Sequence, residues 1–228
     1  MLRSLFISIG MIFFLSGCST NKLAFHSNPE EALSKSDPII LFTAHLRNDY
    51  RVSIQPTLLG INIHSLDDEG EDVISYFHAG NDDSALLKPE VEEEGNEYLI
   101  SIQLKPDHFE LPSMTSMGQT FPFFGVYLLT LELPFDVEDG HVYYLGHIEG
   151  VIRERQGDEE RAGSVIPLID QAIIGASGGT WDVEISDRYE EDMKKFVERF
   201  PVLENVVIEK QVLPFIKRAA ASEHTQDS

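Results

Sequence analysis

Short apolar runs of strand length recur along most of the chain. The run at 97–105 alternates most regularly: Tyr98, Ile100 and Ile102 point one way, and the polar residues between them point the other. This period of two is typical of a strand with one buried face and one wet face. Further runs of similar length predict strands at 39–46, 57–64, 72–77, 123–133, 142–152, 180–185 and 205–213.

One segment near the end of the chain has the period of a helix instead. Its apolar residues recur three and four positions apart and predict an amphipathic helix with a single apolar stripe. The stripe consists of Tyr189, Met193, Phe196, Val197 and Phe200. Asp187, with Glu190 three residues later, fits a capping box at the start of this helix, and Pro201 ends it.

Repeated strands followed by one helix predict a mostly β fold. We expect an antiparallel β-sandwich of the prealbumin or immunoglobulin type, with one C-terminal amphipathic helix, over residues 37–216. Residues 217–228 are small and polar, and we expect them to form a disordered tail.

The stretch at 109–124 mixes Met114, Met117 and several phenylalanines with small polar residues. We interpret it as a long loop followed by a strand, tucked against the sandwich. The alternative is an exposed apolar lip for a partner or a hydrophobic ligand. The strand expected next, at 123–133, is apolar on both faces, which is typical of a central strand.

The first residues have the order of a secretory signal peptide. Arg3 supplies the only side-chain charge, an apolar run covers 5–15, and small residues follow. A helix over this run would rise about 16 Å, which is too short to cross a bilayer. The run ends in Leu15-Ser16-Gly17-Cys18. This motif resembles the bacterial lipobox, which has a branched apolar residue, two small residues and a cysteine.

The lipobox resemblance implies cleavage before Cys18, a thioether-linked diacylglycerol on its sulfur, and an acyl group such as palmitate on the new amine. Several acyl chains together hold a protein stably on a membrane. Ser19 is not the aspartate that retains such lipoproteins at the inner membrane, so the resemblance favours the outer membrane of a Gram-negative cell. We therefore expect a removed signal at 1–17, and a lipidated cysteine with a flexible tether at 18–36.

A second resemblance covers residues 97–204. It rests on Gly140-His141-Val142-Tyr143-Tyr144-Leu145-Gly146-His147-Ile148, on Val183-Glu184-Ile185-Ser186-Asp187, and on Phe200-Pro201. In this order the pieces resemble a group of uncharacterised bacterial lipoproteins that are thought to contain prealbumin-like β-sandwiches. The resemblance implies a fold rather than an activity.

Acidic residues outnumber basic ones by 39 to 17, which gives a formal charge of −22 at pH 7. Such a chain repels phosphate backbones, so we exclude nucleic acid as a partner. Anionic lipid headgroups are disfavoured beyond the acyl anchor. Cys18 is the only cysteine, and the lipid would use it, so we expect no disulfide within the chain. Stability must therefore come from an apolar core.

The sharpest catalytic candidate is Gly175-Ala176-Ser177-Gly178-Gly179, which fits the G-x-S-x-G nucleophile elbow. It is also similar to the G-D-S-G-G stretch of trypsin-like proteases, as Thr43-Ala44-His45 and the residues after Asp83 are similar to two other fragments of that family. The resemblance implies Ser177 as nucleophile, His45 as base and Asp83 behind the histidine. However, alanine precedes the serine, and the strand at 180–185 leads into a helix rather than into further barrel strands. We interpret the stretch as a glycine-rich loop and keep a trypsin-like serine hydrolase as the alternative.

No metal or cofactor site is expected. The acidic stretches at 67–72 and 81–83 could offer oxygens to calcium, but without EF-hand spacing they are more typical of solvated turns. The eight histidines are scattered without a metal-binding pair. We therefore expect a non-enzymatic, lipid-anchored binding or interaction module of the cell envelope. Its expected partners are the membrane, through acyl chains on Cys18, and another envelope protein.

Overall fold

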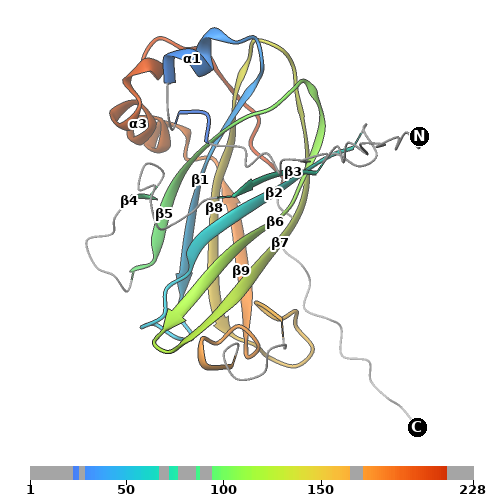
Figure 1. Cartoon of the computed structure of the whole chain (residues 1–228), viewed down its shortest axis with the longest axis vertical. Coiled ribbons are helices and arrows are strands. Elements are labelled where there is room, and N and C mark those ends of the chain that lie inside the picture. The colour runs from blue at the N-terminus through green and yellow to red at the C-terminus, as the bar shows by residue number, and fades with distance from the viewer. Residues whose placement is uncertain are drawn as a thin grey trace, which may run out of the picture.

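The computed structural model describes residues 23–25, 29–66, 72–76, 86–87, 94–164 and 172–214. They form a mostly β structure in which two sheets pack against each other, with helices gathered at one end (Figure 1). The expected signal at 1–17, Cys18, Asp83 and the tail at 217–228 lie outside the described residues. None of the described helices is long and apolar enough to span a membrane.

The larger sheet has the order β10–β8–β1–β5–β4, and β9 also pairs with β8. Its strands are β1 (Ile39–Asn48), β4 (Leu86–Leu87), β5 (Asn96–Gln103), β8 (Val142–Glu154), β9 (Gly179–Ser186) and β10 (Ile208–Lys210). β1 is antiparallel to β5 but parallel to β8, and β10 is also parallel to β8. The prediction of a purely antiparallel fold is therefore wrong for this sheet. The parallel pair arises because the chain passes through the other sheet between β5 and β8, and returns in the direction of β1.

The smaller sheet is antiparallel in every pairing, in the order β3–β2–β6–β7. Its strands are β2 (Thr57–Ser65), β3 (Asp72–Tyr76), β6 (Asp107–Thr120) and β7 (Phe123–Val137). β6 occupies most of the 109–124 stretch, so the loop predicted there is wrong. Two features hide this strand in the sequence. Ser113 and Ser116 are buried where apolar residues would be expected, and the register shifts between Leu111 and Ser113.

β7 lies at the edge of the smaller sheet, and its predicted central position is wrong. Alternate residues of β7 are buried, whereas Phe124, Val126 and Leu128 point outward and are 60%, 40% and 43% exposed. Phe121, in the turn between β6 and β7, is 94% exposed. We call these four residues the apolar strip. The second apolar face of β7 is thus an exposed surface.

The main core fills the space between the two sheets. Buried apolar side chains from both sheets form one cluster. Its most deeply buried members include Ile40, Phe42, Leu58, Ile61, Ile100, Leu129 and Ile148. Burying one such side chain contributes about 1.5–3 kcal/mol, so this cluster is the main source of stability in a chain with a single cysteine. The strands predicted at 39–46, 57–64, 97–105, 142–152 and 180–185 are confirmed.

Helices cover part of the outer face of the larger sheet. α1 (Pro29–Ser34), α3 (Tyr189–Arg199) and the 3-10 helix Pro201–Leu203 lie at the end drawn at the top of Figure 1. A second apolar cluster joins them to the sheet. It includes Ile39, Leu41, Leu99, Val142, Phe196, Phe200 and Leu203. The predicted amphipathic helix is confirmed, and its apolar stripe packs on the sheet.

The predicted capping box at the start of α3 is wrong. The residue before the first helical turn is Arg188, not Asp187, and the side chain of Arg188 makes no capping hydrogen bond. Asp187 instead accepts a 3.1 Å hydrogen bond from the backbone N–H of Tyr189. Its other carboxylate oxygen lies 2.7 Å from Lys210 Nζ of β10. Asp187 therefore ties the helix entry to the sheet edge instead of closing the helix on itself.

Part of the expected tether is packed against the domain. Phe25 is 2% exposed, and its ring centroid lies 5.3 Å from that of Phe200. The backbone N–H of Ala24 donates a 2.7 Å hydrogen bond to the carbonyl of Ser101 on β5. The prediction of a flexible tether over 18–36 is corrected accordingly, because its described residues belong to the fold.

Candidate functional site

The structure does not bring Ser177 and His45 together. His45 of β1 lies beside Glu149 of β8. Ser177 lies in the loop before β9, whose first residue, Gly179, pairs with Glu154 at the end of β8. The stretch of β8 between these two points spans about 16 Å, at the rise of an extended strand. The resemblance to trypsin-like proteases therefore gains no geometric support from the described residues.

The glycines of the 175–179 loop allow close packing. Gly175 has φ +90°, a conformation that favours glycine, and a Cβ there would lie 2.9 Å from the ring of Tyr50. A Cβ on Gly179 would lie 2.7 Å from the carbonyl oxygen of Gly175 and 2.7 Å from Ile152 Cγ2. The loop thus has a structural reason for its composition, which supports our interpretation of the stretch.

A different group of polar side chains is buried beneath α3. It consists of Thr43 from β1, Tyr144 and His147 from β8, and Asp192 from α3, and we call it the buried polar cluster. His147 is 1% exposed and the other three are fully buried. Thr43 and His147 meet because they are partners in the parallel register of β1 and β8. The helix then places Asp192 over them.

Asp192 is the centre of the hydrogen bonds in this cluster. Its Oδ2 atom accepts from the hydroxyl of Thr43 at 2.6 Å and from the hydroxyl of Tyr144 at 2.6 Å. His147 Nδ1 lies 2.7 Å from Thr43 Oγ1. Because the single hydroxyl hydrogen of Thr43 goes to Asp192, the imidazole donates through Nδ1, and the lone pair of the neutral ring lies on Nε2.

Two polar atoms of the cluster have no hydrogen-bond partner within the described part of the chain. They are His147 Nε2 and Asp192 Oδ1. Leaving one such buried atom unsatisfied costs about 1–3 kcal/mol. Few buried polar atoms of native structures lack a partner, and a bound ion or water is one explanation for those that do.

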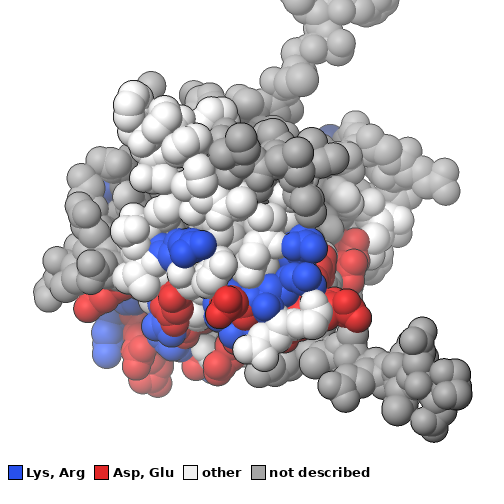
Figure 2. All heavy atoms as spheres, turned by 90° about the horizontal axis from the view of Figure 1, so that it is seen from below, with Lys and Arg blue, Asp and Glu red and all other residues white. Residues whose placement is uncertain are grey.

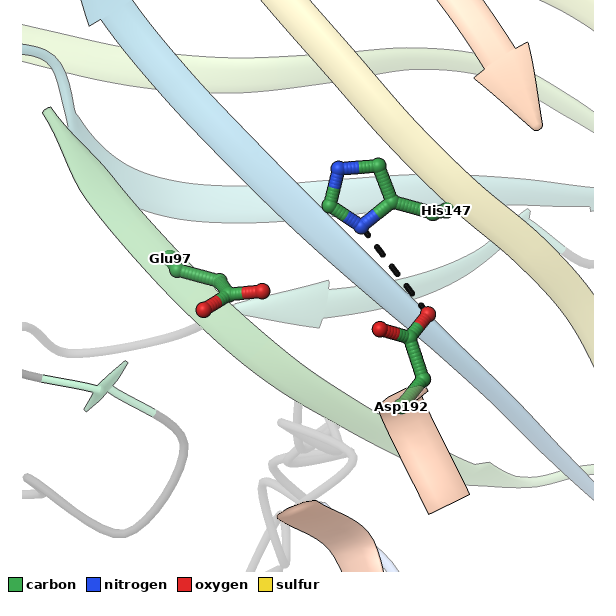
Figure 3. A group of neighbouring side chains, drawn as sticks. All are labelled: Glu97, His147 and Asp192. Atoms are coloured by element: carbon green, nitrogen blue, oxygen red, sulfur yellow. Dashed lines mark ion pairs between the residues drawn. The ribbon is translucent and has the colours of Figure 1, made fainter. Parts of the chain in front are cut away.

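Glu97 and Lys195 adjoin the cluster on its more exposed side. Glu97 lies on β5, its side chain is 22% exposed, and its Oε1 atom is 2.5 Å from Lys195 Nζ of α3. Glu97, His147 and Asp192 each offer one ligand atom, and these three atoms lie within 4.8 Å of one another. Figure 3 shows the three side chains converging from β5, β8 and α3, with the His147–Asp192 pair at 3.9 Å. This is the one group of three or more potential metal ligands among the described residues.

Burial controls the protonation of the cluster. It lowers the pKa of His147 to about 4, and the positive charge of Arg188 adds to this effect. Burial also raises the pKa of the Tyr144 hydroxyl, and its hydrogen bond to Asp192 raises that pKa further. At physiological pH the imidazole is therefore neutral and the phenol protonated. A neutral imidazole is the form that coordinates a metal ion or accepts a proton.

The sequence alone did not predict this site, although it contains one signal. Asp192 comes three residues after Tyr189 and four before Phe196, so it falls on the apolar stripe of the helix. A carboxylate on a buried stripe indicates a partner in the sheet beneath it. Nothing local to Glu97 or His147 gives a comparable signal, because their neighbourhood depends on strand pairing.

The opposite end of the molecule carries a mixed charged surface. Figure 2 views that end and shows acidic and basic side chains intermixed along one side of it. Arg153, near the end of β8, lies 2.6 Å from Glu159 and 2.8 Å from Asp182. The hydrogen bonds from Arg153 and from the backbone N–H of Gln156 lower the pKa of Glu159 to about 2. Positive charge here is thus neutralised by neighbouring carboxylates, which does not favour an anionic ligand.

No protein-family model matches the chain, and comparison with curated proteins and with solved structures finds no match.

Proposed function

We propose that this chain is a lipid-anchored protein of the bacterial cell envelope, most readily placed at the outer membrane, that acts as a non-enzymatic binding or interaction module. The observation that carries the proposal is Leu15-Ser16-Gly17-Cys18 directly after the apolar run at 5–15. We further propose that the two-sheet domain is a prealbumin-like sandwich with a parallel strand pair in one sheet.

The position of the first described residues is compatible with such an anchor. Leu23 packs against the main core. Leu23 comes five positions after Cys18 in the sequence, and an extended chain over that distance spans at most about 17 Å. A lipid on Cys18 would therefore hold the domain close to the membrane surface.

The apolar strip supports the interaction role. Exposed apolar side chains that gather on one face of a domain mark contact surfaces more often than scattered ones do. Phe121 and Phe124 are the most exposed members of the strip. We do not propose the hydrolase, because His45 lies within β1 beside Glu149, whereas Ser177 lies in the loop before β9, near the other end of β8.

The anchor is tested by fractionation of cells that express the full chain. Cys18→Ser should move the protein from the membrane fraction to the soluble envelope fraction and abolish labelling with a radioactive or clickable fatty acid. Thr20→Ala, just beyond the lipobox, is the matched control and should behave like the unaltered protein. Membrane attachment that survives Cys18→Ser contradicts the proposal.

The interaction role is tested separately by site-specific photo-crosslinking in cells. A photoreactive residue at Phe124 should give a discrete crosslinked product. The control position is Val207, which is 84% exposed and directly precedes β10 of the larger sheet. Equal or absent crosslinking at the two positions contradicts an interaction surface at the apolar strip.

A further inference from the structure

We propose that Glu97, His147 and Asp192 form a binding site for a divalent transition-metal ion, with Zn²⁺ as the ion to test. This inference goes beyond the proposed anchoring role and does not depend on it. One imidazole and two carboxylates form a donor set that zinc accepts, whereas calcium and magnesium prefer oxygen ligands alone. Three protein ligands leave the fourth position of a tetrahedral ion for water.

The carboxylate of Asp192 is prepared for a cation. Its Oδ2 atom is held by the hydroxyls of Thr43 and Tyr144, which fix its orientation as outer partners of a metal ligand do. Its Oδ1 atom is buried and has no hydrogen-bond partner among the described residues. In Figure 3 this second oxygen lies on the side that faces Glu97. A cation between the two carboxylates would satisfy it.

The imidazole of His147 meets the chemical requirement for a ligand. An imidazole nitrogen is a ligand that zinc accepts, and the ligand atom of this ring lies within 4.8 Å of those of Glu97 and Asp192. The ring is nearly inaccessible to solvent, so ordinary hydration does not compete for it. Its Nδ1 atom is the nitrogen that faces Asp192, 3.9 Å from Oδ2, so a metal ion on Nδ1 would replace the 2.7 Å hydrogen bond with Thr43, and the ring hydrogen would lie on Nε2 instead.

Lys195 gives a way to distinguish a metal site from a hydrogen-bond network that only stabilises the fold. Its ammonium group sits 2.5 Å from Glu97 and is 37% exposed, so it can turn to solvent. A dication would take the place of this ammonium on Glu97. Lys195 is therefore a competitor of the metal, and removing its charge should strengthen metal binding. A network that serves only structure gives no reason for such a gain.

The test is titration calorimetry of the full chain with Zn²⁺. We expect one site. Glu97→Gln, at a partly exposed position that should still fold, should weaken binding by about tenfold or more, because even outer partners of metal ligands contribute about 10–100-fold. Lys195→Gln should tighten binding by a factor of a few. Asp192→Asn should weaken it, and a circular dichroism melt must show that each variant is folded.

The matched controls are the surface pairs His108–Asp136 and His141–Glu209, whose nitrogen and oxygen atoms lie 2.6 Å apart in each pair. His108→Gln and His141→Gln should leave the affinity for Zn²⁺ unchanged, as should Cys18→Ser. The proposal is overturned if Zn²⁺ does not bind. It is also overturned if binding is unaffected by Glu97→Gln, or is lost in either surface-histidine variant.

Discussion

The buried polar cluster beneath α3 and the 175–179 loop differ in whether a sequence motif marks them and in whether polar side chains meet there. The loop has a motif that a sequence search finds at once, yet its glycines pack against Tyr50 and Ile152, and strand pairing places His45 well away from the start of β9 that follows its serine. The cluster has no local motif, yet it gathers hydroxyls, an imidazole and a carboxylate in one buried place. The run of small residues in the loop thus reflects close backbone packing. The polar side chains of the cluster, in contrast, come together through the register of the strands.

The first test of this comparison is Asp192→Ala, whose free energy of unfolding is measured by chemical denaturation in the presence of a chelator. The change removes the acceptor of two buried hydroxyls, those of Thr43 and Tyr144. We expect the free energy of unfolding to fall by about 3 kcal/mol, because two buried donors lose their partner. Ser177→Ala in the half-exposed loop should change it by less than about 0.5 kcal/mol. A loss below about 1 kcal/mol in Asp192→Ala would show that the cluster contributes little to the fold.

The second test concerns the packing role of the loop. Gly179→Ala would place a Cβ 2.7 Å from the carbonyl oxygen of Gly175, which is backbone and cannot swing aside. We expect about 2 kcal/mol of destabilisation in the same assay, within the usual cost of overpacking. The control is Gly157→Ala, where no atom lies within 4 Å of the added Cβ but φ is +55°. Gly157→Ala therefore shows the cost of a left-handed backbone without crowding, whereas Gly179 has no positive φ and its loss comes from crowding alone. A loss below about 0.5 kcal/mol in Gly179→Ala would argue against tight packing.

The third test is a pH dependence at the charged end of the molecule. The hydrogen bond from Arg153 lowers the pKa of Glu159 from 4.5 to about 2. A carboxylate with a lowered folded pKa stabilises the protein above its unfolded pKa, and this contribution disappears as the pH falls towards the folded value. The melting temperature of the unaltered protein should therefore exceed that of Glu159→Gln above pH 4.5, and the difference should shrink towards pH 2. A difference that is constant with pH would contradict this pairing.

The smallest expected effect is on chemical reactivity. Ser177 lies away from His45, so a fluorophosphonate probe should not label the purified protein. Labelling that is lost in both Ser177→Ala and His45→Ala would establish the hydrolase alternative and reverse the comparison.

The sequence was sufficient for elements whose pattern is local. The alternation at 97–105 and the stripe from Tyr189 to Phe200 correspond to β5 and α3, because burial of one face imposes its period on the sequence. β6 was missed because Ser113 and Ser116 face the interior and a register shift interrupts the alternation.

Features that depend on pairing between distant segments could not be predicted from local sequence patterns. The parallel pairing of β1 with β8 depends on where the chain re-enters the larger sheet, and that pairing alone places His147 beside Thr43. The edge position of β7 likewise depends on which strands pair. Its sequence is apolar on both faces and does not show whether the face that carries Val126 is buried or exposed. Within the sequence itself, only Asp192, a carboxylate on an apolar stripe, indicated part of the site.

The central claim is that potential metal ligands of this protein are assembled beneath α3, whereas the 175–179 loop owes its composition to packing. Anomalous diffraction at the zinc absorption edge, from crystals of the protein grown with Zn²⁺, tests it most directly. We predict one anomalous peak enclosed by Glu97, His147 and Asp192, with Lys195 turned away from Glu97. Peaks confined to surface histidines, with the Glu97–Lys195 contact intact, would contradict it.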